Sequence, residues 1–242
     1  MKVTYLSHSG FLLEAETANF IFDYYQGELP RLEPEKPLVV FVSHGHADHY
    51  NRKIYQWLRY YPKARYILPK DIPTRRLIAE QEAQGIPLGR AVIQLRKNTT
   101  QELLLFNGCP LTVTTLKSTD AGVAYLIEYE GSTIYHAGDL NLWYWSGETR
   151  QYNENMTRAF LREMEKLRGI RIDLAFIPLD PRLGVHSMDG PRLFLEYTTC
   201  KWVFPMHMWG NYDIIAEFIH KYPQYQEQLA VITHEGQVFQ CY

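Results

Sequence analysis

The chain has 242 residues, of which 46% are hydrophobic and 21% charged, a balance typical of a globular protein that buries a sizeable core. The formal net charge of −2 argues against a dedicated nucleic-acid binder, because such proteins usually present a basic surface. No run approaches 18 consecutive apolar residues, which argues against a membrane span.

The N-terminal stretch and the cysteines bear on the cellular compartment in which the protein is expected. The opening MKVTYLSHSGFLLE has no apolar signal core and no small-residue cleavage site. Cys109, Cys200 and Cys241 are widely separated and form no CxxC pair, which fits a reducing environment. We therefore expect a cytoplasmic protein.

The first part of the chain predicts short strands followed by helices. Alternating or continuous apolar runs between polar and glycine turns predict strands over 3–7, 11–15, 19–23 and 38–42. Apolar residues at helical spacing then predict a helix over 51–61, which Pro62 ends, and another over 73–84, which Gly85 ends.

The second part repeats this layout without repeating the sequence. We expect strands over 103–106, 111–116, 123–129, 132–136, 174–177, 202–205 and 230–233. Helices are expected over 155–168, 190–197 and 212–221, and the polar stretch 150–155 is expected to be a lid or a loop. Because strands come in runs and each half ends in helices, we expect an α+β fold of two packed mixed sheets with helices outside, in one domain over 1–242.

The densest chemistry follows the apolar run LVVFV, in the segment His44-Gly45-His46-Ala47-Asp48-His49. Imidazole nitrogens and carboxylate oxygens bind zinc or manganese well. We expect Gly45 to let the backbone turn without a side chain in the way, so that His44 and His46 can point to one ion. Asp48 and His49 project differently and can reach a second ion beside the first. The alternative, a polar loop with incidental histidines, explains such crowding poorly.

This HxHxDH run resembles the signature of the metallo-β-lactamase superfamily, whose fold is a four-layer αββα sandwich with metals at the edge between the two sheets. The resemblance continues in YHAGD, where Asp139 matches the bridging aspartate, and in VFPMH, where His207 matches the final ligand. The opening LSHSGFLLE is similar to the branch that includes ascorbate-6-phosphate lactonase-like enzymes. The likeness covers residues 3 to about 240.

One position departs from the family pattern. The histidine that should precede the strand 123–129 is absent, and the sequence there reads KSTDAG. Asp120 is the best replacement, because a carboxylate also binds a hard or borderline cation. An ordinary turn aspartate before Gly122 is the alternative. The resemblance thus implies one ion held by His44, His46, Asp139 and, on this hypothesis, Asp120, and another held by Asp48, His49, Asp139 and His207.

Other histidines have competing interpretations. His8, in the SHSGF turn, either orients a ligand or is a plain turn residue. His136 is expected to be packed and hydrogen-bonded rather than a ligand. His186 follows the Asp180-Pro181-Arg182 loop and is a candidate pocket residue or reserve ligand, although a solvent-facing loop histidine is the stronger interpretation.

Aromatic side chains flank the predicted ligands and suggest where a substrate binds. LWYW follows Asp139, and Trp209 follows His207. Trp143 and Trp209 either line a pocket for a planar or sugar-like group or pack in the core. Arg182 is a candidate to hold an anionic substrate, or else a solvated charge. Together with His186 these are the candidate substrate-binding residues.

The resemblance implies a metal-dependent hydrolase in which a metal-bound hydroxide attacks a small ester, lactone, amide or phosphodiester. It also implies that Asp48 holds a metal and accepts or orients the proton of the hydroxide. Zinc is the expected cofactor, as one or two ions per chain, with manganese or iron as alternatives, and the partner is a small molecule. A nuclease acting on RNA or DNA ends is a second interpretation, which the lack of a Lys/Arg cluster disfavours. A metal-poor binding scaffold is the third, supported only by the missing histidine.

Overall fold

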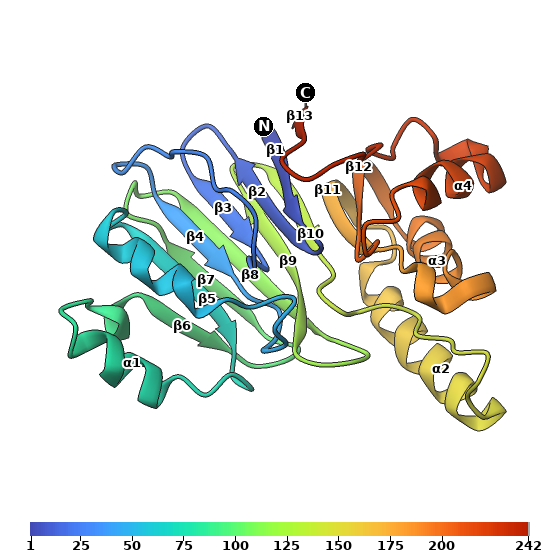
Figure 1. Ribbon diagram of the computed structural model, residues 1–242, viewed down its shortest axis with the longest axis horizontal. Coiled ribbons are helices and arrows are strands. Elements are labelled where there is room, and N and C mark those ends of the chain that lie inside the picture. Colours follow the sequence, from blue (N-terminus) through green and yellow to red (C-terminus); the bar gives the residue numbers. More distant parts are fainter. Residues whose placement is uncertain (242) are drawn as a thin grey trace.

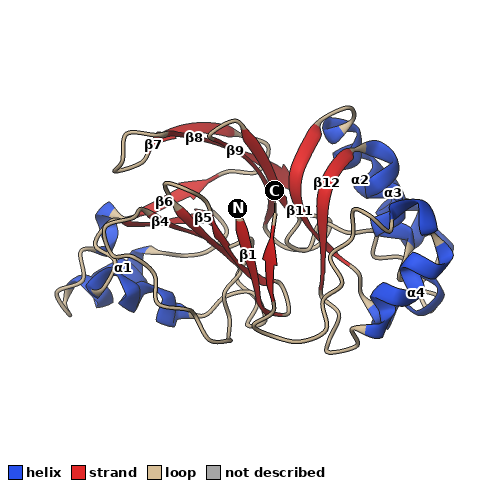
Figure 2. Ribbon diagram, turned by 90° about the horizontal axis from the view of Figure 1, so that it is seen from above, coloured by secondary structure: helices blue, strands red, loops and turns tan. Residues whose placement is uncertain are grey.

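The computed structural model describes residues 1–241 and has two β-sheets packed face to face, with helices on both outer sides (Figure 2). The first sheet has seven strands, in the order β13 (Val238–Gln240), β1 (Lys2–Ser7), β2 (Gly10–Glu14), β3 (Asn19–Phe22), β4 (Leu38–Phe41), β5 (Ala64–Pro69) and β6 (Val92–Leu95). The second has six, in the order β12 (Thr199–Met206), β11 (Arg171–Pro178), β10 (Ser132–His136), β9 (Val123–Tyr129), β8 (Pro110–Lys117) and β7 (Thr100–Leu104).

Each sheet has its own helical layer (Figure 1). The first is covered by η1 (Arg52–Arg59), α1 (Arg75–Glu82) and η2 (Leu88–Arg90). The second carries α2 (Arg150–Leu167), η3 (Pro181–His186), α3 (Asp189–Tyr197), α4 (Asp213–Lys221) and η4 (Pro223–Tyr225). The expected α+β fold with an αββα layering is therefore confirmed. No helix of the described chain is long and apolar enough to cross a membrane.

The core between the sheets explains why the central strands are so apolar. β4 pairs in parallel with both β3 and β5, and all four of its residues are buried. Its Phe41 stacks on Phe22 with ring centroids 5.2 Å apart, while Val40 faces the helical layer instead. A strand covered on both faces needs apolar residues at every position, which accounts for the continuous LVVF run.

The strands direct the polar segments to one edge of the sandwich. His8 follows β1, Asp23 follows β3, and the His44–His49 segment lies just beyond β4. In the second sheet, Asp139 lies beyond the carboxyl end of β10 and His207 directly follows β12. Side chains separated by up to 199 positions in the sequence, from His8 to His207, therefore meet at this edge.

Several predicted elements differ from the structure. β5 and β6 were not predicted. β5 is almost wholly buried and lacks the alternation that identifies a half-exposed strand, whereas β6 is a short edge strand that is only partly buried. The segment 51–61 forms a 3₁₀ helix rather than an α-helix. The stretch 150–155 is neither lid nor loop but the first turns of α2, capped by Thr149, whose hydroxyl accepts from the amide of Tyr152 at 3.2 Å. The segment 230–233 forms no strand, and β13 closes the described chain instead.

Candidate metal centre

Asp23 organises the segment that follows β4. Its carboxylate is fully buried and accepts hydrogen bonds from the backbone amide and the hydroxyl of Ser43, both at 2.6 Å. The same carboxylate lies 2.8 Å from Nδ1 of His49. Ser43 Oγ lies 2.9 Å from Nδ1 of His44. One buried carboxylate therefore fixes the ring orientation of two histidines and leaves both Nε2 atoms directed elsewhere.

Two glycines allow three loops to meet at Ser43. A Cβ on Gly122 would lie 2.0 Å from the carbonyl oxygen of Ser43, and one on Gly138 would lie 2.5 Å from the Ser43 Cβ. Both glycines have positive φ, at +67° and +51°. Our expectation that Gly45 is the glycine needed for this turn is wrong, because its φ lies outside the left-handed region and a Cβ there would meet only Ile72, at 3.8 Å.

Asp139 joins the two sets of histidines that the sequence places apart. Its Oδ2 lies 3.2 Å from Nε2 of His44. Its Oδ1 lies 3.1 Å from Nε2 of His49 and 3.2 Å from Nε2 of His207. The carboxylate is almost wholly buried, so both of its oxygens are directed at imidazole nitrogens rather than at bulk water.

The nitrogen and oxygen atoms of this site are better placed to bind a metal ion than to form hydrogen bonds with one another. Although His44 Nε2 is close to Asp139, neither this nitrogen nor Asp139 Oδ1 makes a hydrogen bond of acceptable geometry. The buried Nε2 of His8 is also without a hydrogen bond. Buried polar atoms are rarely left unpaired, and converging imidazole and carboxylate atoms are the ligands that zinc, manganese and iron accept. The residues therefore fit a divalent cation.

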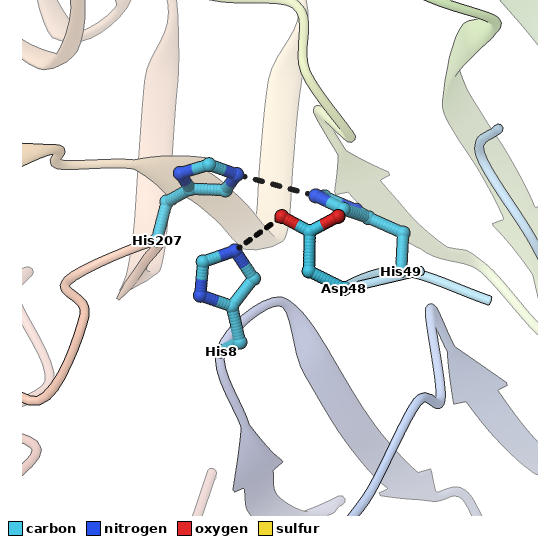
Figure 3. A group of neighbouring side chains, drawn as sticks. All are labelled: His8, Asp48, His49 and His207. Carbon is cyan, nitrogen blue, oxygen red and sulfur yellow. Dashed lines mark hydrogen bonds and ion pairs between the residues drawn. The ribbon is translucent and has the colours of Figure 1, made fainter. Parts of the chain in front are cut away.

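Two clusters of ligand-type atoms result, each with its atoms within 4.8 Å of one another. His44, His46 and Asp139 form the first cluster. The second contains His8, Asp48, His49 and His207, whose side chains point toward one another from separate loops (Figure 3). A third grouping of Asp23 with His44 and His49 is better explained by hydrogen bonding, because the Asp23 oxygens already accept from Ser43 and His49.

His8, for which the sequence left two interpretations open, lies in the second cluster. Its Nε2 lies 3.5 Å from Oδ2 of Asp48, and its ring centroid lies 4.1 Å from that of His207. The β1–β2 turn holds it there, since His8 has φ +52° and its carbonyl accepts from the amide of His207 at 3.2 Å. A histidine with its backbone in the left-handed region is uncommon and is often found at functional sites. The motif SHSGF carried no spacing signal that could have shown this.

His207 is held from its other side by the buried carboxylate of Asp180, which is also paired with Arg182. Its Nδ1 lies 2.8 Å from Oδ2 of Asp180, whose carboxylate is fully buried. Arg182 donates to the same carboxylate from Nε and Nη2, at 2.6 to 3.0 Å, and its guanidinium lies 4.3 Å from the ring centroid of Trp209. Trp209 also donates from Nε1 to Asp180 at 3.3 Å. Asp180 thus orients His207 as Asp23 orients His49.

Carboxylates of the site raise the pKa of two of its histidines, His49 and His207. Burial by itself would lower the pKa of His49, but the carboxylates of Asp139 and Asp23 outweigh burial and raise this pKa to about 10. Burial would likewise raise the pKa of Asp139, but His49, His207 and His44 hold it well below its ordinary value. Carboxylates that hold protons on buried histidines also favour a cation in their place.

A cavity of about 300 Å³ opens over this centre. Asp120 lines it, as do His46, Trp143 and Arg182. The carboxylate of Asp120 is exposed and falls outside all three groups of ligand-type atoms in the described chain, so its role as the replacement ligand stays a prediction.

The remaining predicted residues lie outside the cavity lining. His136 is fully buried and hydrogen-bonded through Nε2 to the carbonyl of Ser9 at 3.0 Å, as a packed histidine would be. Trp209 is about half exposed beneath Arg182. His186 lies 2.9 Å from Asp189 and packs on Tyr144, with ring centroids 4.2 Å apart. Its assignment to the substrate pocket therefore stays a prediction.

The chain is similar in sequence and in fold to known metal-dependent hydrolases. The family model described as the beta-lactamase superfamily domain matches residues 2–146. A UPF0173 metal-dependent hydrolase of Bacillus velezensis is 27% identical over 225 residues, covering 90% of this chain and 89% of its own. One from Opitutus terrae is 29% identical over 221 residues, covering 87% and 86%. Igni18, a metallo hydrolase from Ignicoccus hospitalis, has a similar fold, with a TM-score of 0.66 at 17% identity over 99% of this chain and 98% of its own.

Proposed function

This chain belongs to the beta-lactamase superfamily, and from that premise we propose that it is a hydrolase of small esters, lactones, amides or phosphodiesters that works with two divalent cations, zinc in the first instance. The coarser class, a metal-dependent hydrolase, is that of its relatives in Bacillus and Opitutus. The pairing of two ions and the substrate range are our proposal.

The observation that carries the proposal is the position of Asp139 between two clusters. One of its oxygens faces His44, and the other faces His49 and His207, all at 3.1 to 3.2 Å. A carboxylate with imidazoles on both sides is suited to bridge two adjacent ions. In this proposal His44, His46 and Asp139 hold one ion, and His8, Asp48, His49, His207 and Asp139 supply ligands to the other.

Bound divalent cations would lower the pKa of water from about 15.7 toward 7 and stabilise the negative charge that develops on the attacked group. The residues around them have separate tasks. Asp48 lines the cavity with about a third of its side chain exposed, and it would orient the attacking water through a carboxylate oxygen. Asp23 and Asp180 keep the Nδ1 atoms of His49 and His207 occupied, so that Nε2 stays available.

Asp120 enters the proposal as the ligand that completes the first cluster. It stands in the turn that Gly122 brings against Ser43, and its carboxylate lines the same cavity as His46. The turn is fixed by Thr119, whose hydroxyl donates to the carbonyl of Asn141 at 2.6 Å. Rotation of the exposed Asp120 side chain is therefore the movement by which it would reach an ion.

Metal stoichiometry tests this proposal. We would measure metal per chain by mass spectrometry on protein purified without chelator, for the wild type, Asp120→Ala and Asp139→Asn. Two ions in the wild type, about one in Asp120→Ala and fewer than one in Asp139→Asn are expected. Asp173→Asn is a matched control, because this aspartate accepts from the amide of Thr133 far from the centre.

Activity is then measured on the metal-loaded protein with 4-nitrophenyl acetate, bis-4-nitrophenyl phosphate and a simple lactone. Hydrolysis of at least one class that chelation abolishes, and that Asp139→Asn lacks, is expected. Folded wild-type protein that binds no metal at all would refute the hydrolase proposal. One ion in both the wild type and Asp120→Ala would refute only the dinuclear part and the role of Asp120.

A further inference from the structure

The cavity over the metal centre has two chemically different walls. One is apolar and comes from the segment between β10 and the first turns of α2, with Trp143, Trp145, Tyr152 and Met156. The other contains Arg182, the one Lys or Arg among the described residues that line the cavity. A pocket of about 300 Å³ is at the small end of the range for ligand sites, so it is suited to a compact molecule.

The aromatic wall is held by hydrogen bonds and is not loose packing. Trp143 donates from Nε1 to the carbonyl of Asp139 at 2.9 Å. The backbone of Trp145 is paired twice with the side chain of Asn153, whose Oδ1 accepts at 3.1 Å and whose Nδ2 donates at 2.8 Å. Asn153 is buried in α2, so the loop cannot move without breaking both bonds. The two indoles are nearly parallel, with a 9° angle between planes.

Tyr152 shows that part of this aromatic surface is open to a ligand. It is 40% exposed, although it lies beside a cavity that offers apolar contact. Rigid aromatic rings provide large contact areas at low entropic cost and prefer planar partners. The wall is therefore suited to a planar, unsaturated group.

Arg182 is fixed in one orientation with part of its guanidinium unused. Its Nε and Nη2 donate to Asp180, and Trp209 packs against its face, while its Nη1 donates to none of the described residues. About half of the side chain is exposed. A guanidinium that is already ordered loses little entropy when it binds an anionic oxygen.

We propose that the substrate of this site carries an aromatic or other planar group, which binds against Trp145 and Tyr152, and an anionic carboxylate or phosphate oxygen, which binds Nη1 of Arg182. This inference rests on the proposed hydrolase function and adds the chemical class of the substrate. The metal centre, which the cavity shares through Asp48 and Asp139, lies beside both walls, so the scissile bond joins or adjoins these two groups.

Binding of product-like probes tests the inference without requiring turnover. Naphthalene-2-carboxylate, naphthalene-2-phosphonate and the neutral naphthalene-2-carboxamide are titrated by calorimetry into the metal-loaded protein. The readout is the ratio of the affinity for each anion to the affinity for the amide. Comparison of the two anions distinguishes carboxylate from phosphate recognition, and the ratio cancels any general loss of folded protein.

Three variants probe Arg182 itself and its surroundings. Arg182→Gln is expected to reduce the anion-to-amide ratio about tenfold or more, the typical effect of a charge-assisted hydrogen bond. Arg182→Lys keeps the charge and is expected to lose less. Arg192→Gln is the matched control, because this arginine is also paired with a carboxylate, Glu196, and lines no part of the cavity.

One further variant probes the aromatic wall. Trp145→Leu is expected to weaken all three ligands about two- to tenfold while leaving the ratio unchanged. Trp202→Leu, on β12 and outside this cavity, serves as its control.

The outcomes separate this inference from the hydrolase proposal. An unchanged anion-to-amide ratio in Arg182→Gln, or failure of all three probes to bind the wild type at millimolar concentration, overturns it even if the protein hydrolyses esters. If Trp145→Leu binds every probe as tightly as the wild type does, the aromatic part of the inference is overturned. Conversely, a protein that shows the Arg182-dependent ratio but hydrolyses nothing retains the inference and loses the proposed function.

Discussion

Replacement of Asp23 by asparagine gives the sharpest test of how the metal centre is built. The substitution keeps the volume of this fully buried side chain but removes one acceptor. Oδ2 of Asp23 is the oxygen that faces both the Ser43 hydroxyl, at 2.6 Å, and Nδ1 of His49, at 2.8 Å. An amide nitrogen at that position can satisfy His49 only if the imidazole changes tautomer and carries its proton on Nε2.

The proton would then occupy the nitrogen that lies 3.1 Å from Asp139 and 3.2 Å from His207. In the wild type, a metal that displaces the Nε2 proton leaves Nδ1–H donating to Asp23, whereas in the variant the remaining proton would have to sit on Nδ1 and face the asparagine amide group. Loss of a residue that orients a ligand typically costs about 10- to 100-fold in metal affinity, or about 1.4 to 2.7 kcal/mol. We expect Asp23→Asn to fall in this range for the ion that His49 binds.

The assay is competition with a chromophoric chelator, with zinc titrated into metal-free protein. Circular dichroism establishes that each variant is folded, and Asp173→Asn is the control for an aspartate that accepts a backbone amide elsewhere. A folded Asp23→Asn protein with zinc affinity within twofold of the wild type would show that the tautomer of His49 does not matter. The orienting role assigned to Asp23 would then have to be abandoned.

Three further predictions concern the same centre. Gly122→Ala places a Cβ 2.0 Å from the Ser43 carbonyl oxygen, so urea unfolding is expected to show a loss above about 2 kcal/mol, whereas Gly131→Ala, also at positive φ but with open space, is expected to lose about 1 kcal/mol. Equal losses would contradict the steric argument. His8→Ala is expected to leave the fold intact and to lower zinc affinity in the chelator assay; an unchanged affinity would make His8 a packing residue. When metal is present at a hundred times its Kd, removing it with a chelator is expected to lower the melting temperature by about 5–10 °C. If calorimetry shows an unchanged melting temperature, the metal does not contribute to stability.

Much of the architecture followed from patterns that are local in sequence. Apolar runs between turns predicted β1 to β4 and β8 to β12 because most of these strands have continuous or alternating burial that a short window shows. Where burial depended on neighbours, prediction failed. β5 pairs in parallel with β4 and β6, and β6 is an edge strand that pairs in parallel with β5, and a window of their own residues does not show this pairing.

The candidate metal ligands divide in the same way. His44, His46, Asp48 and His49 could be proposed as ligands from residue type and spacing alone, because one turn delivers them together. Asp139 and His207 required the resemblance to a family, since nothing local distinguishes an aspartate after one strand or a histidine after another. The structure brings all of them within contact distance at one edge of the sandwich.

The sequence by itself determined the fold class, the polar motif behind β4 and the type of chemistry, because these depend on residue type and short-range order. Only the tertiary structure decided that His8 joins the second cluster, that Asp23 and Asp180 orient the histidines, and that Gly122 and Gly138, not Gly45, permit the close approach. Each of these depends on the distance between residues that are remote in the chain. Those distances are set by strand order and loop packing, which a single sequence read in short windows does not contain.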